Sequence, residues 1–136
     1  MDDLEIIDEI NLTAGTTYTL TFEIENNLDS PGEDIGEEIA EEDDEHQFFF
    51  SFTEDAFSDP TGNGNIDNTS DPVNYADSDD NNNPVGLLTT WTTSSDALSD
   101  GTFTVRLQHQ PDIKSSSTGA NDGDTDFDLT FVLNIQ

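Results

Sequence analysis

The sequence predicts a mainly β fold, an antiparallel β-sandwich of immunoglobulin-like type with about seven strands and one short acidic helix. Three observations lead to this prediction. Apolar residues gather in short runs that alternate with polar ones, turn-rich segments separate these runs, and no strand alternates with a long helix. With 136 residues the chain has the length of one domain, so residues 1–136 are expected to share a single core.

The N-terminal part of the chain predicts two strands. The segment Leu4–Leu12 is short and rich in apolar residues, and Ala14-Gly15 then provides a turn into Thr16–Glu25. A strict alternation of apolar and polar residues is typical of a strand with one buried face. The apolar residues of the second segment follow that alternation and are Tyr18, Leu20, Phe22 and Ile24.

A short acidic helix is predicted over about Pro31–Glu45. The residues Ser30–Glu33 have the spacing of a capping box, with proline at the first helical position. Ile35 and Ile39 lie one turn apart and give this helix a narrow apolar stripe.

The middle of the chain predicts three strands, with a long loop after the first. The strands are His46–Thr53, Val73–Asp77 and Val85–Thr93, and the loop covers Glu54–Ser70, which is rich in Asp, Gly, Asn and Pro. In the first strand every second residue is expected to share one face, and these residues are His46, Phe48, Phe50 and Phe52.

Two further strands complete the predicted sandwich. Gly101–His109 alternates cleanly, and its inward face would run from Phe103 to His109. The segment Pro111–Gly123 is expected to be a loop. The core side of the final strand is expected to consist of Phe127, Leu129, Phe131, Leu133 and Ile135.

The charge of the chain excludes several classes of partner. Lys and Arg together number 2 against 32 Asp and Glu, for a formal net charge of −30. A chain without a basic patch binds neither a nucleic-acid backbone nor an anionic membrane surface. It must recruit cations from metal ions, salt, or an outer-membrane or cell-surface protein with a basic face. No apolar run is long enough to span a membrane, and no signal peptide is present, as expected for a secreted protein trimmed of its leader.

A transition-metal site is predicted where the acidic helix meets the strands. Residues 41–45 are all acidic and crowd the predicted C-terminal end of the helix, where the helix dipole is already negative. Glu38, Glu42 and His46 are spaced to share one helix face. His46 begins an inward-facing strand and His109 ends one, so antiparallel pairing would bring both rings to one rim. Two imidazoles with carboxylates suit Zn(II), or Cu, Ni or Co.

Two alternatives stay open. In the simpler one, His109 hydrogen-bonds a loop carbonyl and His46 pairs with a neighbouring glutamate. In the other, oxygen-rich loops bind Ca(II), because this ion prefers carboxylate and amide oxygens as ligands. None of these loops has the pattern of an EF-hand. The carboxylates proposed for Ca(II) are those of Asp77, Asp79, Asp124 and Asp126.

The sequence contains none of the common catalytic patterns. It has no Cys nucleophile, nucleotide-binding glycine loop, esterase serine motif or zinc-protease motif. We therefore expect a protein that is not an enzyme.

Several segments resemble a family of small secreted lipoproteins of Bacteroidota, from about Thr13 onward. The segments that carry the resemblance are Glu37–Phe50, Tyr75–Asp79, Asn83–Leu87, Arg106–Lys114 and Asn121–Phe131. Members of that family have a lipid-attachment cysteine after a signal peptide, followed by an acidic β-rich domain. The resemblance implies a periplasmic or surface-exposed location in the cell envelope, with a lipid anchor on the full-length protein.

Together these observations predict a non-enzymatic cell-envelope protein that binds a divalent transition metal, with Zn(II) as the expected ion. The alternative is a Ca(II)-stabilised structural, adhesion or partner-binding module of the cell surface.

Overall fold

The computed structural model describes residues 9–21, 25–26, 33–34, 42–68, 70–115 and 117–136. The elements among them are β1 (Ile10–Leu12), β2 (Thr17–Thr21), β3 (Glu25–Asn26), β4 (Glu33–Asp34), the 3-10 turn η1 (Asp43–Glu45), β5 (His46–Phe52), β6 (Phe57–Asp59), β7 (Leu88–Thr93), β8 (Leu98–His109) and β9 (Asp124–Ile135).

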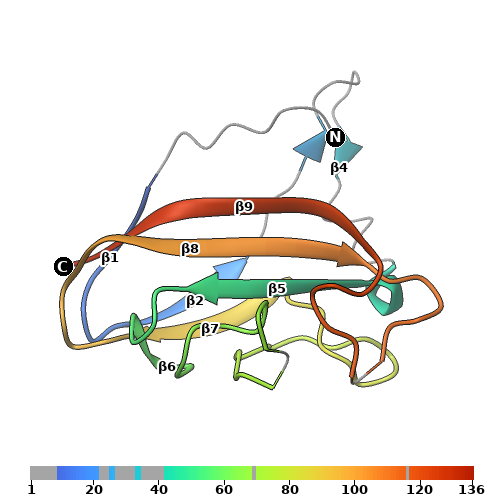
Figure 1. The fold of residues 1–136 in the computed structure, drawn as a ribbon, viewed down its shortest axis with the longest axis horizontal. Helices are drawn as coiled ribbons and strands as arrows, with labels where there is room; N and C mark the ends of the chain where they lie inside the picture. Colours follow the sequence, from blue (N-terminus) through green and yellow to red (C-terminus); the bar gives the residue numbers. More distant parts are fainter. Residues whose placement is uncertain (1–8, 22–24, 27–32, 35–41, 69, 116) are drawn as a thin grey trace.

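The strands form two main sheets (Figure 1). One has the order β1-β9-β8-β5 and the other the order β2-β7-β6, while β3 and β4 pair separately. Among the described strands, β1 and β9 are parallel and the other pairs are antiparallel. The predicted mainly β, antiparallel fold is therefore confirmed. If β2 and β5–β9 are taken as strands B to G, the sheets have the B-E-D and C-F-G orders of immunoglobulin-type sandwiches. Membership of that fold stays a prediction.

The core lies between the two sheets and is built from aromatic rings. Trp91 on β7 meets Phe50 and Phe52 on β5, with ring centroids 5.2 and 5.5 Å apart. It also meets Phe103 on β8 at 5.1 Å. Trp91 and the inward apolar residues of β5 and β8 are almost completely buried, as the alternation in the sequence predicts, whereas His109 is half-buried. Gln47 and Phe49 on the other face of β5 are buried as well, which the alternation does not predict.

The loop after β8 folds back against that strand and is fixed by side chains. The Arg106 guanidinium and the side-chain amides of Gln108 and Gln110 donate to carbonyl oxygens of residues 119–122. These bonds satisfy the buried N–H donors of the two amides, which would otherwise be costly, while Oε1 of Gln110 has no hydrogen-bond partner among the described residues. Arg106 also pairs with Asp128 at 2.8 Å, so it lies beside a carboxylate of β9.

Two segments differ from the sequence prediction. β6 lies within the predicted loop Glu54–Ser70, because Phe57 is buried against Phe52 and Trp91 despite its polar neighbours. The predicted strand Val73–Asp77 makes one isolated bridge to β7, at Tyr75 and Thr89. Side chains of Tyr75 and Asp77 also hold this segment, through bonds to the Phe48 carbonyl and to the N–H groups of residues 86 and 87.

The predicted helix over about Pro31–Glu45 is wrong where the structure describes it. Glu33–Asp34 is a short strand paired with Glu25–Asn26, and Asp43–Glu45 forms one 3-10 turn. Clustered acidic side chains repel one another, which disfavours a longer helix at that point. Residues 35–41 of the prediction lie outside the described residues. Among the described residues, no helix has the length and apolar character needed to cross a bilayer.

Candidate metal centre

The two histidines meet at one end of the strand pair β5–β8. The pairing places His46 directly opposite His109. The two rings are stacked, with centroids 4.6 Å apart and planes inclined by 14°. Both side chains come from the inward-facing positions that the alternation predicts.

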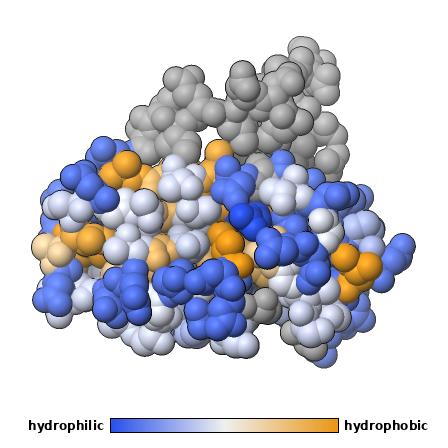
Figure 2. Space-filling view, viewed as in Figure 1, coloured by the Kyte–Doolittle hydropathy of each residue, from blue (hydrophilic) through white to orange (hydrophobic). Residues whose placement is uncertain are grey.

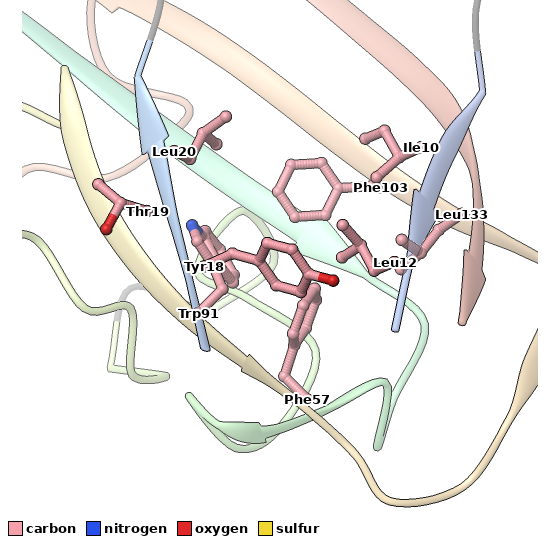
Figure 3. A pocket seen from close by; sticks show the side chains of 9 residues that line it. All are labelled: Ile10, Leu12, Tyr18, Thr19, Leu20, Phe57, Trp91, Phe103 and Leu133. Carbon is pink, nitrogen blue, oxygen red and sulfur yellow. The ribbon is translucent and has the colours of Figure 1, made fainter. Parts of the chain in front are cut away.

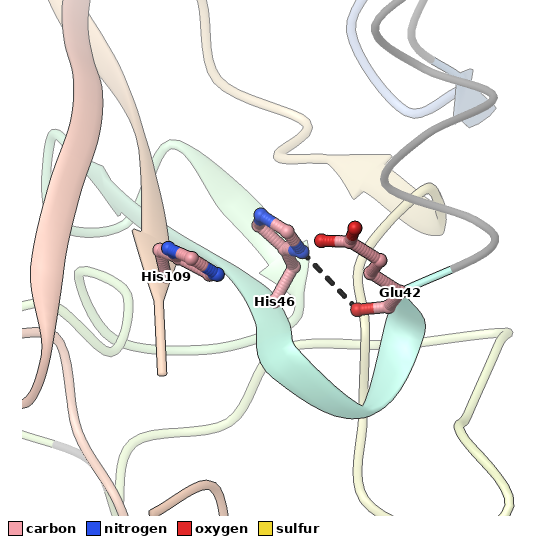
Figure 4. A group of neighbouring side chains, drawn as sticks. All are labelled: Glu42, His46 and His109. Carbon is pink, nitrogen blue, oxygen red and sulfur yellow. Dashed lines mark hydrogen bonds between the residues drawn. The ribbon is translucent and has the colours of Figure 1, made fainter. Parts of the chain in front are cut away.

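Glu42 joins the two histidines from the chain just before η1 (Figure 4). One ligand atom from each of Glu42, His46 and His109 lies within 4.8 Å of the other two. Glu38, the weaker predicted carboxylate, lies outside the described residues. Three of the four predicted transition-metal ligands are thus brought together.

The turn that presents Glu42 is fixed by backbone and side-chain bonds. The Glu45 N–H donates to the Glu42 carbonyl at 2.9 Å and closes the turn. The Lys114 ammonium donates to the Asp43 carbonyl at 2.7 Å. A cation at this carbonyl stabilises a turn whose side chains are all acidic and which has no basic residue of its own.

Both ring nitrogens of His46 face hydrogen-bond acceptors. Nδ1 lies 3.1 Å from the Glu42 carbonyl oxygen, and Nε2 lies 3.4 Å from Oδ2 of Asp126. A neutral imidazole has one N–H and satisfies only one of these acceptors. The Glu42 carbonyl also accepts the Glu45 N–H, and the Asp126 side chain is 41% exposed to water, so neither acceptor depends on His46. The ring nitrogen without a hydrogen keeps a lone pair that a cation could use.

The His109 ring also has a nitrogen atom that is not satisfied by a hydrogen bond among the described residues. Within the part of the chain that the structure describes, its Nε2 is buried and has no hydrogen-bond partner. Leaving a polar atom buried and unpaired costs about 1–3 kcal/mol. A metal ion is one partner that would satisfy this nitrogen.

Coordination by both rings requires one of them to turn. The lone pair of an imidazole nitrogen lies in the ring plane, and stacked planes do not direct two lone pairs at one point. The terminal torsion of histidine is soft, so this rotation is inexpensive. An ion at roughly 2.0–2.1 Å from each tetrahedral ligand also needs those ligand atoms roughly 3.4 Å apart. Binding of one ion by both histidines would therefore require this rotation and a closer approach of the ligand atoms.

Three of the four aspartates predicted for Ca(II) have partners of their own, and these are Asp77, Asp79 and Asp126. Asp77 accepts the N–H groups of Gly86 and Leu87 at 2.8 and 2.9 Å. Asp124 lies opposite His109 at the start of β9, and Asp126 faces His46. Among the described residues, the group of potential metal ligands includes none of the four aspartates.

Asp79 belongs to a buried ion pair that the sequence did not predict. Its Oδ1 accepts N–H bonds from Asn81 and Asn83, and its Oδ2 lies 3.0 Å from the Lys114 ammonium. The two side chains are 0% and 1% exposed. Burial works to raise the pKa of Asp79, but the Asn83 N–H, the Lys114 ammonium and the Asn81 N–H outweigh it and lower that pKa. Asp79 and Lys114 lie in different loops, so neither alternation nor residue spacing in the sequence indicates that they pair.

The contact between Asp126 and His46 also escapes sequence reasoning. A bulge shifts the β8–β9 register, so that Leu107 pairs with Phe127 and Gln108 with Thr125. Asp126 has no direct partner in that ladder and reaches the histidine end instead. Simple alternation along the strand would have placed Asp126 with Asp124 and Asp128 on the outer face of the sheet.

Comparisons with family models, curated proteins and solved structures find no match for this chain. The resemblance to Bacteroidota lipoproteins therefore stays a prediction.

Proposed function

We propose that this chain is a non-enzymatic metal-binding protein of the cell envelope that holds one divalent transition metal ion, with Zn(II) as the expected ion. The observation that carries the proposal is the meeting of donor atoms from Glu42, His46 and His109 within 4.8 Å. Zn(II) takes imidazole nitrogen and carboxylate oxygen as ligands, and Cu(II), Ni(II) and Co(II) accept the same set.

The hydrogen bonding of His46 supports this ligand set. If Nε2–H donates to Asp126, the lone pair of Nδ1 faces the Glu42 carbonyl, and the two repel. A metal ion bound at Nδ1 replaces that repulsion with attraction. Asp126 then acts as the carboxylate that orients a metal-bound histidine through its other nitrogen.

The charge of the chain supports a cation in particular. With a formal net charge of −30, any bound cation relieves repulsion among the carboxylates. Figure 2 shows hydrophilic side chains over most of the visible face, with small hydrophobic areas between them. The envelope location and the lipid anchor rest on the resemblance described above.

The alternative Ca(II)-stabilised adhesion or partner-binding module has less support. Asp77 and Asp79 already accept backbone N–H bonds, and Asp79 also pairs with Lys114. A carboxylate used in this way offers fewer lone pairs to a hard cation.

Calorimetric titration of the metal-free chain with Zn(II) tests the proposal. We expect saturable binding of one ion per chain, lost in His46→Gln and His109→Gln and weakened in Glu42→Gln. Glu54→Gln is a matched control, because it removes the same charge from an exposed glutamate outside the cluster. A parallel titration with Ca(II) is expected to give no binding at this site. Equal Zn(II) binding by the parent and both histidine variants would overturn the proposal.

A further inference from the structure

A second feature of the molecule lies away from the histidines. It is an apolar cavity of about 150 Å³ between the two sheets (Figure 3). Both sheets contribute to its lining, which includes Leu12, Tyr18, Leu20, Phe57, Trp91 and Phe103.

The cavity has a buried floor and a partly exposed rim. Phe57, Trp91 and Phe103 on the floor are between 3% and 5% exposed. The rim residues Leu12 and Leu20 come from β1 and β2 and are only half-buried. β1 is an edge strand of one sheet and β2 an edge strand of the other, and they do not pair with each other. The cavity therefore lies where no backbone ladder joins the two sheets.

The lining offers a ligand apolar contact and few hydrogen bonds. The Trp91 indole N–H already donates to Thr89 Oγ1 at 2.8 Å. The Tyr18 hydroxyl accepts the Thr13 N–H at 2.8 Å. On the floor, the ring centroid of Trp91 lies 5.0 Å from that of Phe57 and 5.1 Å from that of Phe103. These packed rings hold one another in place.

These properties define the ligand by size and charge. A closed apolar cavity of roughly 150 Å³ holds benzene, and a partly open one of that volume has room for a ring of the same size. A strongly acidic chain repels an anionic ligand. We propose that this cavity is a binding site for an uncharged apolar molecule about the size of one aromatic ring. This site is independent of the proposed metal centre.

Trp91 supplies the readout, because it is the only tryptophan of the chain and lies in the floor. We expect toluene to change Trp91 fluorescence in a saturable manner and to raise the melting temperature, since a ligand that binds the folded state stabilises it. Benzoate carries the same ring with a negative charge, and it is expected to produce neither effect.

Filling the cavity from its rim provides the decisive variant. Leu20→Phe is expected to abolish the saturable toluene response while keeping a cooperative melt. Val132→Phe adds the same ring at an exposed position outside the cavity and is expected to bind toluene as the parent does. If Leu20→Phe does not fold, Leu12→Phe takes its place. An unsaturable response of the parent, or an equal response of the filled variant and the Val132→Phe control, would overturn the proposal.

Discussion

The two ends of the strand pair β5–β8 use the same inward-facing positions for different purposes. At one end Phe52 lies opposite Phe103, and at the other His46 lies opposite His109. Phe52 packs against Phe57 and Trp91 with centroids 5.0 and 5.5 Å apart, so the rings at this end stabilise one another by packing. At the histidine end His46 is buried and His109 is half-buried, and their ring nitrogens face two acceptors or no partner among the described residues. The same alternation thus produces packed aromatic rings at one end and a polar site at the other.

The largest expected effect comes from removing one ring at each end. Phe52→Ala should lower the free energy of unfolding by about 3–5 kcal/mol, because it leaves a cavity among packed rings. His109→Ala should lower it by roughly 1 kcal/mol or less in the metal-free protein, because the ring that is lost carries an unsatisfied nitrogen. Urea unfolding measures both free-energy changes, provided that the m-value of each variant equals that of the parent. Equal losses at the two ends would break the comparison.

The next largest effect on stability is expected from the buried ion pair of Asp79 and Lys114. Asp79→Asn should lower the free energy of unfolding by roughly 3 kcal/mol, because Lys114 stays buried without its carboxylate. This is the low end of the range for breaking a buried pair, since the Asp43 carbonyl remains as a partner of Lys114. In the double variant Asp79→Asn/Lys114→Met the loss should be smaller than the sum of the single losses.

The same variant has a pH signature. The folded-state pKa of Asp79 lies below its ordinary value of 3.8, so its stabilisation is present above that value and is lost as the pH falls through the folded pKa. Unfolding free energies of the parent should therefore fall more steeply below about pH 4 than those of Asp79→Asn. Parallel acid limbs would show that this carboxylate contributes nothing to acid stability.

Tyr75 lies between the two ends of the strand pair and should make the stability of the fold depend on pH in the alkaline range. Its hydroxyl donates to the Phe48 carbonyl and accepts from Asn65, and burial raises the pKa of Tyr75 to about 12. Its stabilisation is complete below the unfolded pKa of 10 and is lost as the pH rises toward 12, at roughly 1.4 kcal/mol for each pH unit. Tyr75→Phe should flatten this slope. The half-buried Tyr18 should ionise first, because the Thr13 N–H lowers its pKa, and a single phenolate step in near-ultraviolet absorbance would contradict this order.

The last expected effect concerns how His46 is oriented. Asp126→Asn should weaken Zn(II) binding by about 10–100-fold while leaving the stoichiometry unchanged, as expected for a carboxylate that orients a ligand. Asp128→Asn removes the same charge from the same strand, but its partner is Arg106. It should leave the affinity near that of the parent, and equal weakening by both variants would reduce the role of Asp126 to its charge alone.

Much of the fold could be predicted from the sequence, because it follows from local alternation. His46–Phe52 and the strand ending at His109 were expected at nearly their observed bounds. The meeting of their histidines was expected on the condition that these strands pair antiparallel, and they do. The strand of Phe57 was missed because a single buried ring among polar residues carries no periodic signal. The helix failed because a capping pattern at Ser30–Glu33 is a local preference, and Glu33 pairs in a strand instead.

The candidate site could be predicted only in part. His46 and His109 were recognisable because each stands at the end of an apolar stripe. Glu42 was selected because its spacing would place it on a helix face with His46, but it lies near the histidines because of a 3-10 turn instead. Asp126 reaches the site only through a bulge. Lys114 reaches the turn only because its loop folds back, and the sequence states neither of these long-range facts.

X-ray absorption at the zinc edge of the Zn(II)-loaded protein tests the central claim most directly. The account predicts a four-coordinate ion with nitrogen and oxygen ligands at about 2.0–2.1 Å and the scattering pattern of two imidazoles. Loss of the imidazole signal in His109→Gln would assign one of these ligands. A zinc ion surrounded by oxygen alone would contradict the account.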